Sequence, residues 1–178
     1  MFYPNERIAL IIDGVNLHGV GRALGFEIDY HKLRSYFVTK GKLLRASYFT
    51  TTLENEEFSS LRGLIDWLHY NGFMVHEKQA REFTDNAGNR KIKGTMNVEM
   101  AMEAFELSEH IDHLIIFTGD GELRAMVEAV RRKGVRVTVV SSLKTSPPMV
   151  SDDLRRQCDN FVEFGPSGCC RAEPEIMM

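Results

Sequence analysis

Short apolar runs that end abruptly in acidic residues are the strongest pattern in this chain. Residues 8–12 are five consecutive apolar residues, and Asp13 follows them directly. Residues 114–117 form a second apolar run, and Asp120 and Glu122 follow it within five residues. Uninterrupted runs of this length are typical of strands buried on both faces of a parallel sheet. We therefore expect two core strands whose carboxyl ends carry carboxylates.

The rest of the chain alternates between helical and strand-like patterns. Helices are predicted over residues 29–39, 54–70, 95–108, 122–133 and 151–158, and further strands over residues 43–50, 73–79, 135–140 and 161–164. Strands separated by helices give right-handed crossovers and a sheet covered on both sides. The predicted fold is α/β, a three-layer α/β/α sandwich with a mainly parallel sheet of five to six strands. If the chain winds outward from the first strand, Asp13 and Asp120 meet.

Two segments interrupt this alternation. Residues 17–27 contain three glycines, which favour a loop or an irregular start of a helix; they are Gly19, Gly21 and Gly25. Residues 80–93 contain a turn-forming cluster, Asp-Asn-Ala-Gly-Asn, at positions 85–89. Such a cluster between two strand-like segments predicts a hairpin-like excursion.

The helix over residues 95–108 is predicted to bury one apolar stripe. The members of this stripe recur at helical spacing: Val98, Ala101, Met102 and Phe105. The chain has no internal repeat, and its 178 residues are enough for one domain with a full core. We expect one domain over residues 1–164 and a disordered tail over residues 165–178, where the residues are small, polar or terminal.

Composition and charge narrow the class of protein. A net charge of -3 does not indicate a nucleic-acid binder, so a polyanion would need a local basic patch or a metal ion. The three cysteines do not form a disulfide framework, which favours a reducing compartment. No segment has the length of a membrane-spanning helix or the pattern of a signal peptide. We expect a cytoplasmic protein with no membrane association.

Three motifs in order resemble those of a known family. They are Asp13-Gly14-Val15-Asn16, then Lys93-Gly94 ahead of a helix, then Thr118-Gly119-Asp120-Gly121-Glu122. Together they resemble the NYN domain, and more narrowly its bacterial LabA-like branch, which is related to the PIN-domain nucleases. The resemblance extends over residues 8–164. It implies a PIN-like fold, an acidic cluster that binds Mg²⁺ or Mn²⁺, and metal-dependent cleavage of RNA.

The chain departs from the family pattern at three of the acidic positions. Asn97 and Glu103 stand where the family usually has Asp along one helix, and Glu122 stands where the last motif usually ends in Asp. Asn97 can offer a neutral carbonyl oxygen to a metal ion, but it can neither neutralise the ion nor act as a base. Fewer carboxylates should weaken a Mg²⁺ site.

The resemblance and the motifs together suggest a role for each polar residue. The predicted metal ligands are Asp13, Asp120, Asn97, Glu122 and Glu103, and the first four are also the predicted catalytic residues. Asn16 and Thr118 are predicted to orient water or a phosphate oxygen, and Lys93 to pair with phosphate. Hydrolysis of a phosphodiester needs an activated water, charge neutralisation and a stabilised leaving oxygen, and a divalent ion held by carboxylates serves all three.

Each of these residues also has a purely structural interpretation. Asp13, Asn97 and Asp120 can cap helices. Glu103 is as well explained by a solvated helix face, and Lys93 as one of several charges on the hairpin. Among the six histidines, His18 can approach the site, but a surface position is the preferred interpretation for all six.

RNA is the expected partner, and the basic residues near the proposed site are Arg90, Lys91 and Lys93. Because these basic residues are few, we expect RNA affinity to be modest and sensitive to salt. A homodimer and a regulatory protein partner stay open. The alternative function is a catalytically weakened NYN domain that binds RNA or a regulatory partner without cutting.

Overall fold

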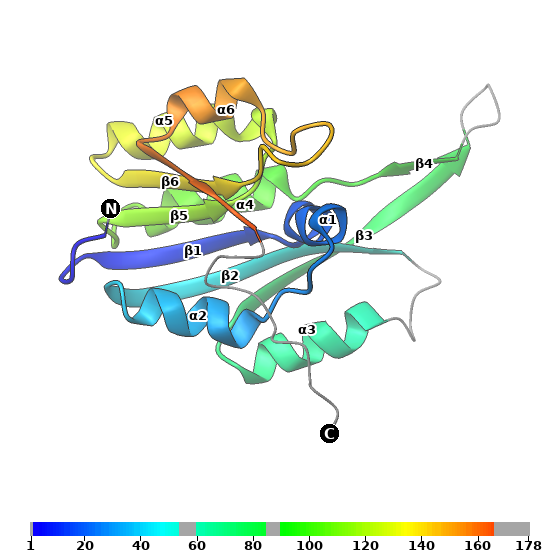
Figure 1. Ribbon diagram of the computed structural model, residues 1–178, viewed down its shortest axis with the longest axis horizontal. Coiled ribbons are helices and arrows are strands. Elements are labelled where there is room, and N and C mark those ends of the chain that lie inside the picture. The colour runs from blue at the N-terminus through cyan, green and yellow to red at the C-terminus, as the bar shows by residue number, and fades with distance from the viewer. Residues whose placement is uncertain (1, 54–59, 85–89, 166–178) are drawn as a thin grey trace.

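The computed structural model describes residues 2–53, 60–84 and 90–165, and its centre is a seven-stranded sheet with the order β4-β3-β2-β1-β5-β6-β7 (Figure 1). The strands are β1 (Arg7–Asp13), β2 (Lys42–Leu53), β3 (Met74–Thr84), β4 (Arg90–Lys93), β5 (His113–Phe117), β6 (Arg136–Ser141) and β7 (Asn160–Glu163). Every neighbouring pair is parallel except β3 and β4. The prediction of a mainly parallel sheet is confirmed, and the hairpin strand β4 raises the number of strands to seven.

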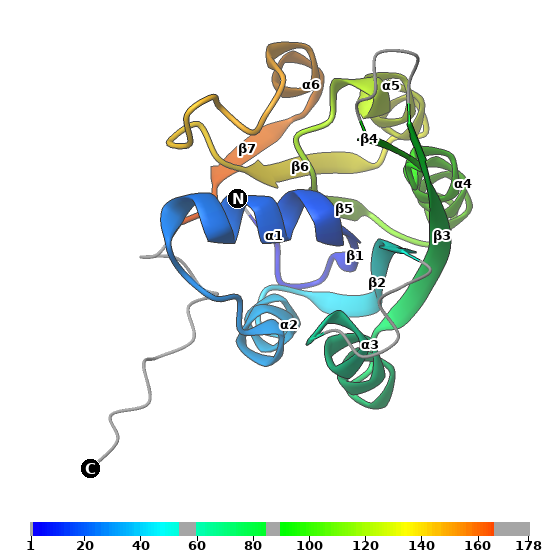
Figure 2. The same ribbon diagram turned by 90° about the vertical axis from the view of Figure 1, so that its right-hand side faces the viewer.

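Helices cover both faces of this sheet, as the two views show (Figures 1 and 2). One face is covered by α1 (Gly14–Leu24), α2 (Tyr30–Val38) and α3 (Ser60–Tyr70), and the other by α4 (Asn97–Leu107), α5 (Arg124–Arg132) and α6 (Asp152–Gln157). A single 3-10 turn, η1 (Gly121–Leu123), precedes α5. The predicted three-layer α/β/α architecture is confirmed.

Strand β1 is the centre of the core because its side chains reach both layers. Ile8, Leu10 and Ile12 pack with the layer of α1 to α3, while Ala9 and Ile11 pack with the layer of α4 to α6. All five are fully buried. Full burial of a Leu or Ile side chain stabilises a fold by roughly 1.5–3 kcal/mol, so this short run anchors both layers.

The carboxyl ends of β1 and β5 lie side by side. Strand β1 pairs in parallel with β2 on one side and with β5 on the other, and Ile12 is the register partner of Phe117. The chain therefore winds outward from β1 in both directions, as predicted. Open α/β sheets bind ligands at this kind of topological switch point, and Asp13 and the segment 118–122 both lie there.

The expectation of a loop or irregular helix over residues 17–27 is wrong for most of that segment. Helix α1 begins at Gly14 and ends at Leu24, and Gly25 follows it in the left-handed conformation, with a φ of 71°. Gly costs a helix interior about 1 kcal/mol relative to Ala, but the Asp13 cap and tertiary contacts offset this. A Cβ atom at Gly21, for example, would lie 2.9 Å from the carbonyl oxygen of Phe26.

The predicted buried stripe of α4 is also wrong. Val98, Met102 and Phe105 are 70%, 60% and 50% exposed, whereas the buried residues of α4 are Met100, Ala104 and Leu107. Helix α4 carries two apolar stripes at helical spacing, and periodicity alone does not say which one faces the sheet. The tertiary arrangement places the Met100 stripe against β1 and β5 and leaves the other outside.

Strands β3 and β4 form the predicted hairpin, which extends past the carboxyl edge of the sheet (Figure 1). The turn cluster at residues 85–89, the predicted helical residues 54–59 and residues 166–178 of the predicted tail lie outside the described residues. Among the helices that the structure describes, none is long and apolar enough to cross a membrane.

At the opposite edge of the sheet, His113 is fully buried at the start of β5. Its Nε2 lies 2.7 Å from the hydroxyl of Thr138, and its Nδ1 lies 3.1 Å from a guanidinium nitrogen of Arg136 and 3.3 Å from Glu6. The pKa of His113 is lowered to about 4, chiefly by burial and also by the charge of Arg136, while Glu6 acts in the opposite direction. The imidazole is therefore neutral at pH 7.

We expect His113 to make the folded state acid-sensitive. Because its pKa is lower in the folded than in the unfolded chain, its contribution is complete above about pH 6.5 and is lost as the pH falls towards 4. From pH 7.5 to pH 5 the free energy of unfolding should fall by about 2 kcal/mol through this group. Urea denaturation of wild type and His113→Gln at both pH values measures it, and equal pH dependence in the two proteins would contradict it.

A second prediction tests which face of α4 is buried. Met100→Ala should lower the free energy of unfolding by about 2–5 kcal/mol, because it leaves a cavity between α4 and the sheet. Met102→Ala, the same change two residues away on the exposed stripe, should stay within about 0.5 kcal/mol of wild type. Urea denaturation of both variants decides the matter; equal losses would mean that the exposed stripe is covered.

Candidate functional site

A cavity of about 570 Å³ opens at the carboxyl edge of the sheet, between α1 and α4. Its polar wall is formed by Asp13, Asn16, Thr51, Thr95, Asn97 and Asp120. Its apolar side consists of residues from β2 and α4 together with Val15 and Met149. Four of the predicted site residues, Asp13, Asn16, Asn97 and Asp120, thus line one hollow at the switch point of the sheet.

Asp13 ends β1 and caps α1 at the same time. Its Oδ1 accepts a hydrogen bond from the backbone N–H of Asn16 at 3.0 Å, and its Oδ2 accepts one from the Thr118 hydroxyl at 3.1 Å. Burial raises the pKa of Asp13, the two hydrogen bonds oppose this, and the nearby charge of Asp120 raises it further. The Asp13 carboxylate is therefore under-solvated, and a cation beside it would relieve that cost.

Thr118 connects the two strand ends. Its hydroxyl donates to Asp13 and accepts a hydrogen bond from the backbone N–H of Asp120 at 3.2 Å. Asp120 in turn caps η1, because its Oδ1 accepts from the backbone N–H of Glu122 at 2.9 Å. The capping interpretation of both aspartates is therefore correct. Capping engages Oδ1 of each aspartate, and Oδ2 bonds to another residue of the site.

Asn97 is not the N-cap of α4, since that position belongs to Met96. The amide nitrogen of Asn97 donates instead to Asp120 Oδ2 and to Glu122 Oε2, both at 2.8 Å. Carboxylates only accept hydrogen bonds, so the NH₂ group must be the end that faces them. One neutral amide thus joins two carboxylates at the point where they converge.

Glu103 lies apart from this network. Glu103 accepts a hydrogen bond from the hydroxyl of Ser47 on β2 at 3.0 Å. Lys93 is the last residue of β4, and its side chain lies outside the described residues. Within the described part of the chain, no three His, Cys, Asp or Glu side chains are grouped so that they could hold a metal ion.

Three residues of the site were not foreseen. Thr51 and Thr95 line the cavity, and the position of Thr51 near the carboxyl end of the neighbouring strand β2 was a usable signal. Tyr48 is buried with its hydroxyl against Gly14, where a Cβ atom would overlap it. Burial raises the pKa of Tyr48, and the charge of Asp13 raises it further. Nothing in the sequence pattern pointed to this tyrosine.

Comparison with known proteins agrees with these observations. The model of the NYN domain family matches residues 7–165. The low amplitude and bright protein LabA of Synechococcus elongatus is 28% identical over 167 residues, which cover 92% of this chain and 87% of that protein. A crystal structure of VPA0982 from Vibrio parahaemolyticus, a protein of unknown function, matches with a TM-score of 0.73 at 23% identity, over 90% of this chain and 93% of the other.

The likeness to VPA0982 concerns the fold alone, and it agrees with the three-layer architecture described above. The family match, in contrast, spans nearly the whole described domain and includes all three motifs. The chain belongs to the NYN domain family, is LabA-like in sequence, and has the PIN-like α/β/α fold.

Proposed function

We propose that this protein is a divalent-metal-dependent ribonuclease that hydrolyses phosphodiester bonds of RNA. The observation that carries the proposal is the hydrogen-bonded arrangement of Asp13, Thr118 and Asp120 at the switch point of a PIN-like sheet. It supports the proposal because two acidic side chains from strand ends far apart in the sequence face one open cavity. Such a pair can hold the divalent ion that phosphodiester cleavage would use.

The donor set fits Mg²⁺ or Mn²⁺ if water and substrate complete the coordination. Mg²⁺ is often held by only one or two carboxylates together with water and phosphate oxygens. Asp13 and Asp120 would supply these carboxylates, and Glu122 is next to them. When bound, the ion would neutralise phosphate charge and lower the pKa of a water molecule.

The remaining residues have supporting roles in this proposal. Thr118 holds the Asp13 carboxylate in one orientation through its hydroxyl. The side chains of Asn16 and Thr51 lie on the cavity wall, where they can hydrogen-bond a phosphate oxygen. The hairpin of β3 and β4 extends past this edge and carries basic residues, among them Lys93, that would meet the RNA backbone.

A second candidate is an NYN domain that binds RNA or a regulatory protein without cutting. The Asn97 amide favours it, because its nitrogen occupies oxygens of Asp120 and Glu122 that a cation would need. For a metal ion to take both oxygens, Asn97 must turn away and lose two hydrogen bonds to charged groups, each contributing about 1.5–3 kcal/mol. This competition predicts weak metal affinity.

Cleavage of a labelled, mostly single-stranded RNA pool tests the proposed function. Wild type should cut with Mg²⁺ or Mn²⁺ and not with EDTA, and Asp13→Asn should lower the rate at least about 100-fold, since it removes a metal ligand. Glu103→Gln is the matched control, because Glu103 bonds to Ser47 away from the cavity. If wild type cleaves no RNA with either metal, the nuclease proposal is rejected and the second candidate, a domain that binds without cutting, is retained.

The role of Asn97 can be measured without activity. In EDTA, Asn97→Asp should lower the free energy of unfolding by at least about 2 kcal/mol, because two hydrogen bonds give way to repulsion from Asp120 and Glu122. Mn²⁺ should then raise its melting temperature more than that of wild type. Asn97→Ala is the control, since it loses the same hydrogen bonds without adding charge. Equal responses to Mn²⁺ in all three proteins would show that the amide does not compete with a metal.

A further inference from the structure

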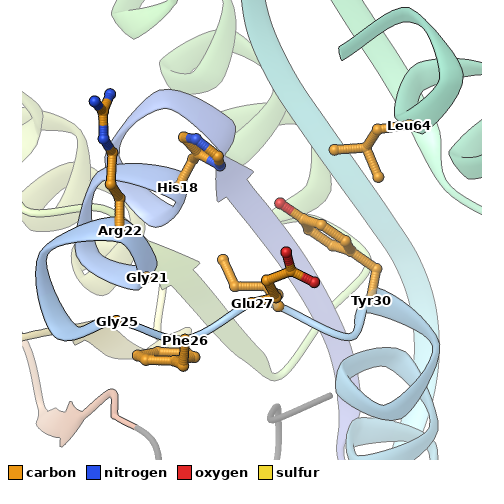
Figure 3. A pocket seen from close by; sticks show the side chains of 9 residues that line it. His18, Gly21, Arg22, Gly25, Phe26, Glu27, Tyr30 and Leu64 are labelled. Carbon is orange, nitrogen blue, oxygen red and sulfur yellow. The ribbon is translucent and has the colours of Figure 1, made fainter. Parts of the chain in front are cut away.

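A second cavity, of about 590 Å³, lies beside α1 on the face of the sheet that carries α2 and α3. Its principal side chains are His18, Arg22, Phe26, Glu27, Tyr30 and Leu64 (Figure 3). It forms where the glycine-containing segment leads from α1 to α2. The proposed function gives this segment no role.

The glycines of this segment shape the cavity. Gly25, in the left-handed conformation, ends α1, and the backbone N–H of Phe26 then bonds back to the carbonyl of Gly21 at 3.0 Å. A side chain at Gly21 would collide with the carbonyl oxygen of Phe26. The chain therefore folds back against the last turn of α1 and leaves a hollow between this turn, Tyr30 and α3.

The cavity offers charged groups that the fold itself does not use. Within the described part of the chain, the side chains of His18, Arg22 and Glu27 make no hydrogen bond or ion pair. His18 and Arg22 are four residues apart and so lie on one side of α1. Figure 3 shows the His18 ring, the Glu27 carboxylate and the Tyr30 hydroxyl around one space, with Leu64 across it. An imidazole, a carboxylate, a phenol hydroxyl and an apolar side chain thus surround the same volume, and Arg22 lines it from the last turn of α1.

The second cavity is close to the candidate site. Asn16 lines the site and His18 and Arg22 line the cavity, so Asn16 and Arg22 are separated by about 9 Å along α1 at 1.5 Å per residue. The hydroxyl of Tyr30 is hydrogen-bonded to that of Tyr48, which lies against the start of α1. One helix and one pair of tyrosines therefore separate two hollows that a single strand of nucleic acid can reach together.

We propose that this cavity binds one nucleotide of the RNA strand whose phosphodiester lies at Asp13, an inference that rests on the proposed function. Arg22 engages a phosphate oxygen through its guanidinium, and a ring N–H of His18 donates a hydrogen bond to the same phosphate. The base enters between Leu64 and Tyr30, where Glu27 accepts a hydrogen bond from a base N–H. The volume is within the range of about 300–1,000 Å³ that small-ligand pockets have, and aromatic side chains beside a cation such as Arg22 are the features that single-stranded RNA sites combine.

Binding of a labelled RNA octamer in EDTA, followed by fluorescence anisotropy, tests the cavity apart from cleavage. The double variant His18→Ala/Arg22→Ala should bind at least about tenfold more weakly, since it loses the guanidinium and a second hydrogen-bond donor to phosphate. Arg62→Ala is the control; Arg62 is an exposed cation on α3 that pairs with Glu77 and Asp66. Its affinity should stay within about twofold of wild type. Equal affinities of wild type and the double variant would overturn the proposal.

An abasic scan of the octamer separates recognition of the base from attraction to phosphate. Removal of one particular base should weaken binding to wild type about fivefold or more, because a base stacked in a pocket contributes strongly. Leu64→Ala should reduce that position-specific effect. A uniform response at every position would refute a base-binding cavity.

The same proteins, assayed for cleavage with Mn²⁺, keep the two proposals distinguishable. Binding that depends on His18 and Arg22 but never leads to cutting would support the cavity and reject the nuclease. Cutting that depends on Asp13 and is unaffected by the double variant would support the nuclease and reject the cavity. Failure of wild type to bind the octamer at all would overturn the cavity proposal.

Discussion

The parallel pairing of β1 with β5 is the interaction on which the rest of the site depends. It brings Asp13 and Thr118, which are 105 residues apart in the sequence, within hydrogen-bonding distance. Both strands are buried on both faces, so their register cannot shift without exposing core residues. The hydrophobic core therefore holds the carboxylates of Asp13 and Asp120 near one another although their charges repel. The free energy that keeps them in place comes from apolar packing of the two strands.

The acidic end of the sheet is stabilised by local donors. Asp13 and Asp120 each accept a backbone N–H at a helix start, and Thr118 bonds to both strand ends. Asn97 adds two further donors between Asp120 and Glu122. A carboxylate in place of Asn97 would strengthen a metal site but add repulsion in its absence. Without a metal ion, the carboxylates at this end of the sheet are therefore stabilised by hydrogen bonds. The same hydrogen bonds lower the affinity of the site for a metal ion.

Helix α1 contributes residues to both cavities, and two of its glycines allow close contacts with neighbouring groups. Its first residue, Gly14, makes room for the Tyr48 hydroxyl, and its last turn contains Gly21, against which the chain folds back. Side chains at either position would displace a buried tyrosine or the backbone of Phe26. The same helix consequently supplies Asn16 to one cavity and His18 to the other. Its glycines are explained by close approach of neighbouring groups and not by flexibility.

The sequence by itself determined the α/β layers and the position of Asp13 and Asp120 at strand ends, because unbroken apolar runs and strand-to-helix alternation are local signals with few global solutions. The two aspartates meet because β1 pairs with β5 in the folded sheet. Only the tertiary structure decided which stripe of α4 is buried, since Met100 and Met102 both belong to acceptable helical patterns. It alone separated Glu103 from the network and turned the Asn97 amide towards two carboxylates. These outcomes depend on how α4 is rotated against the sheet, and helix rotation is set by packing with residues distant in the chain.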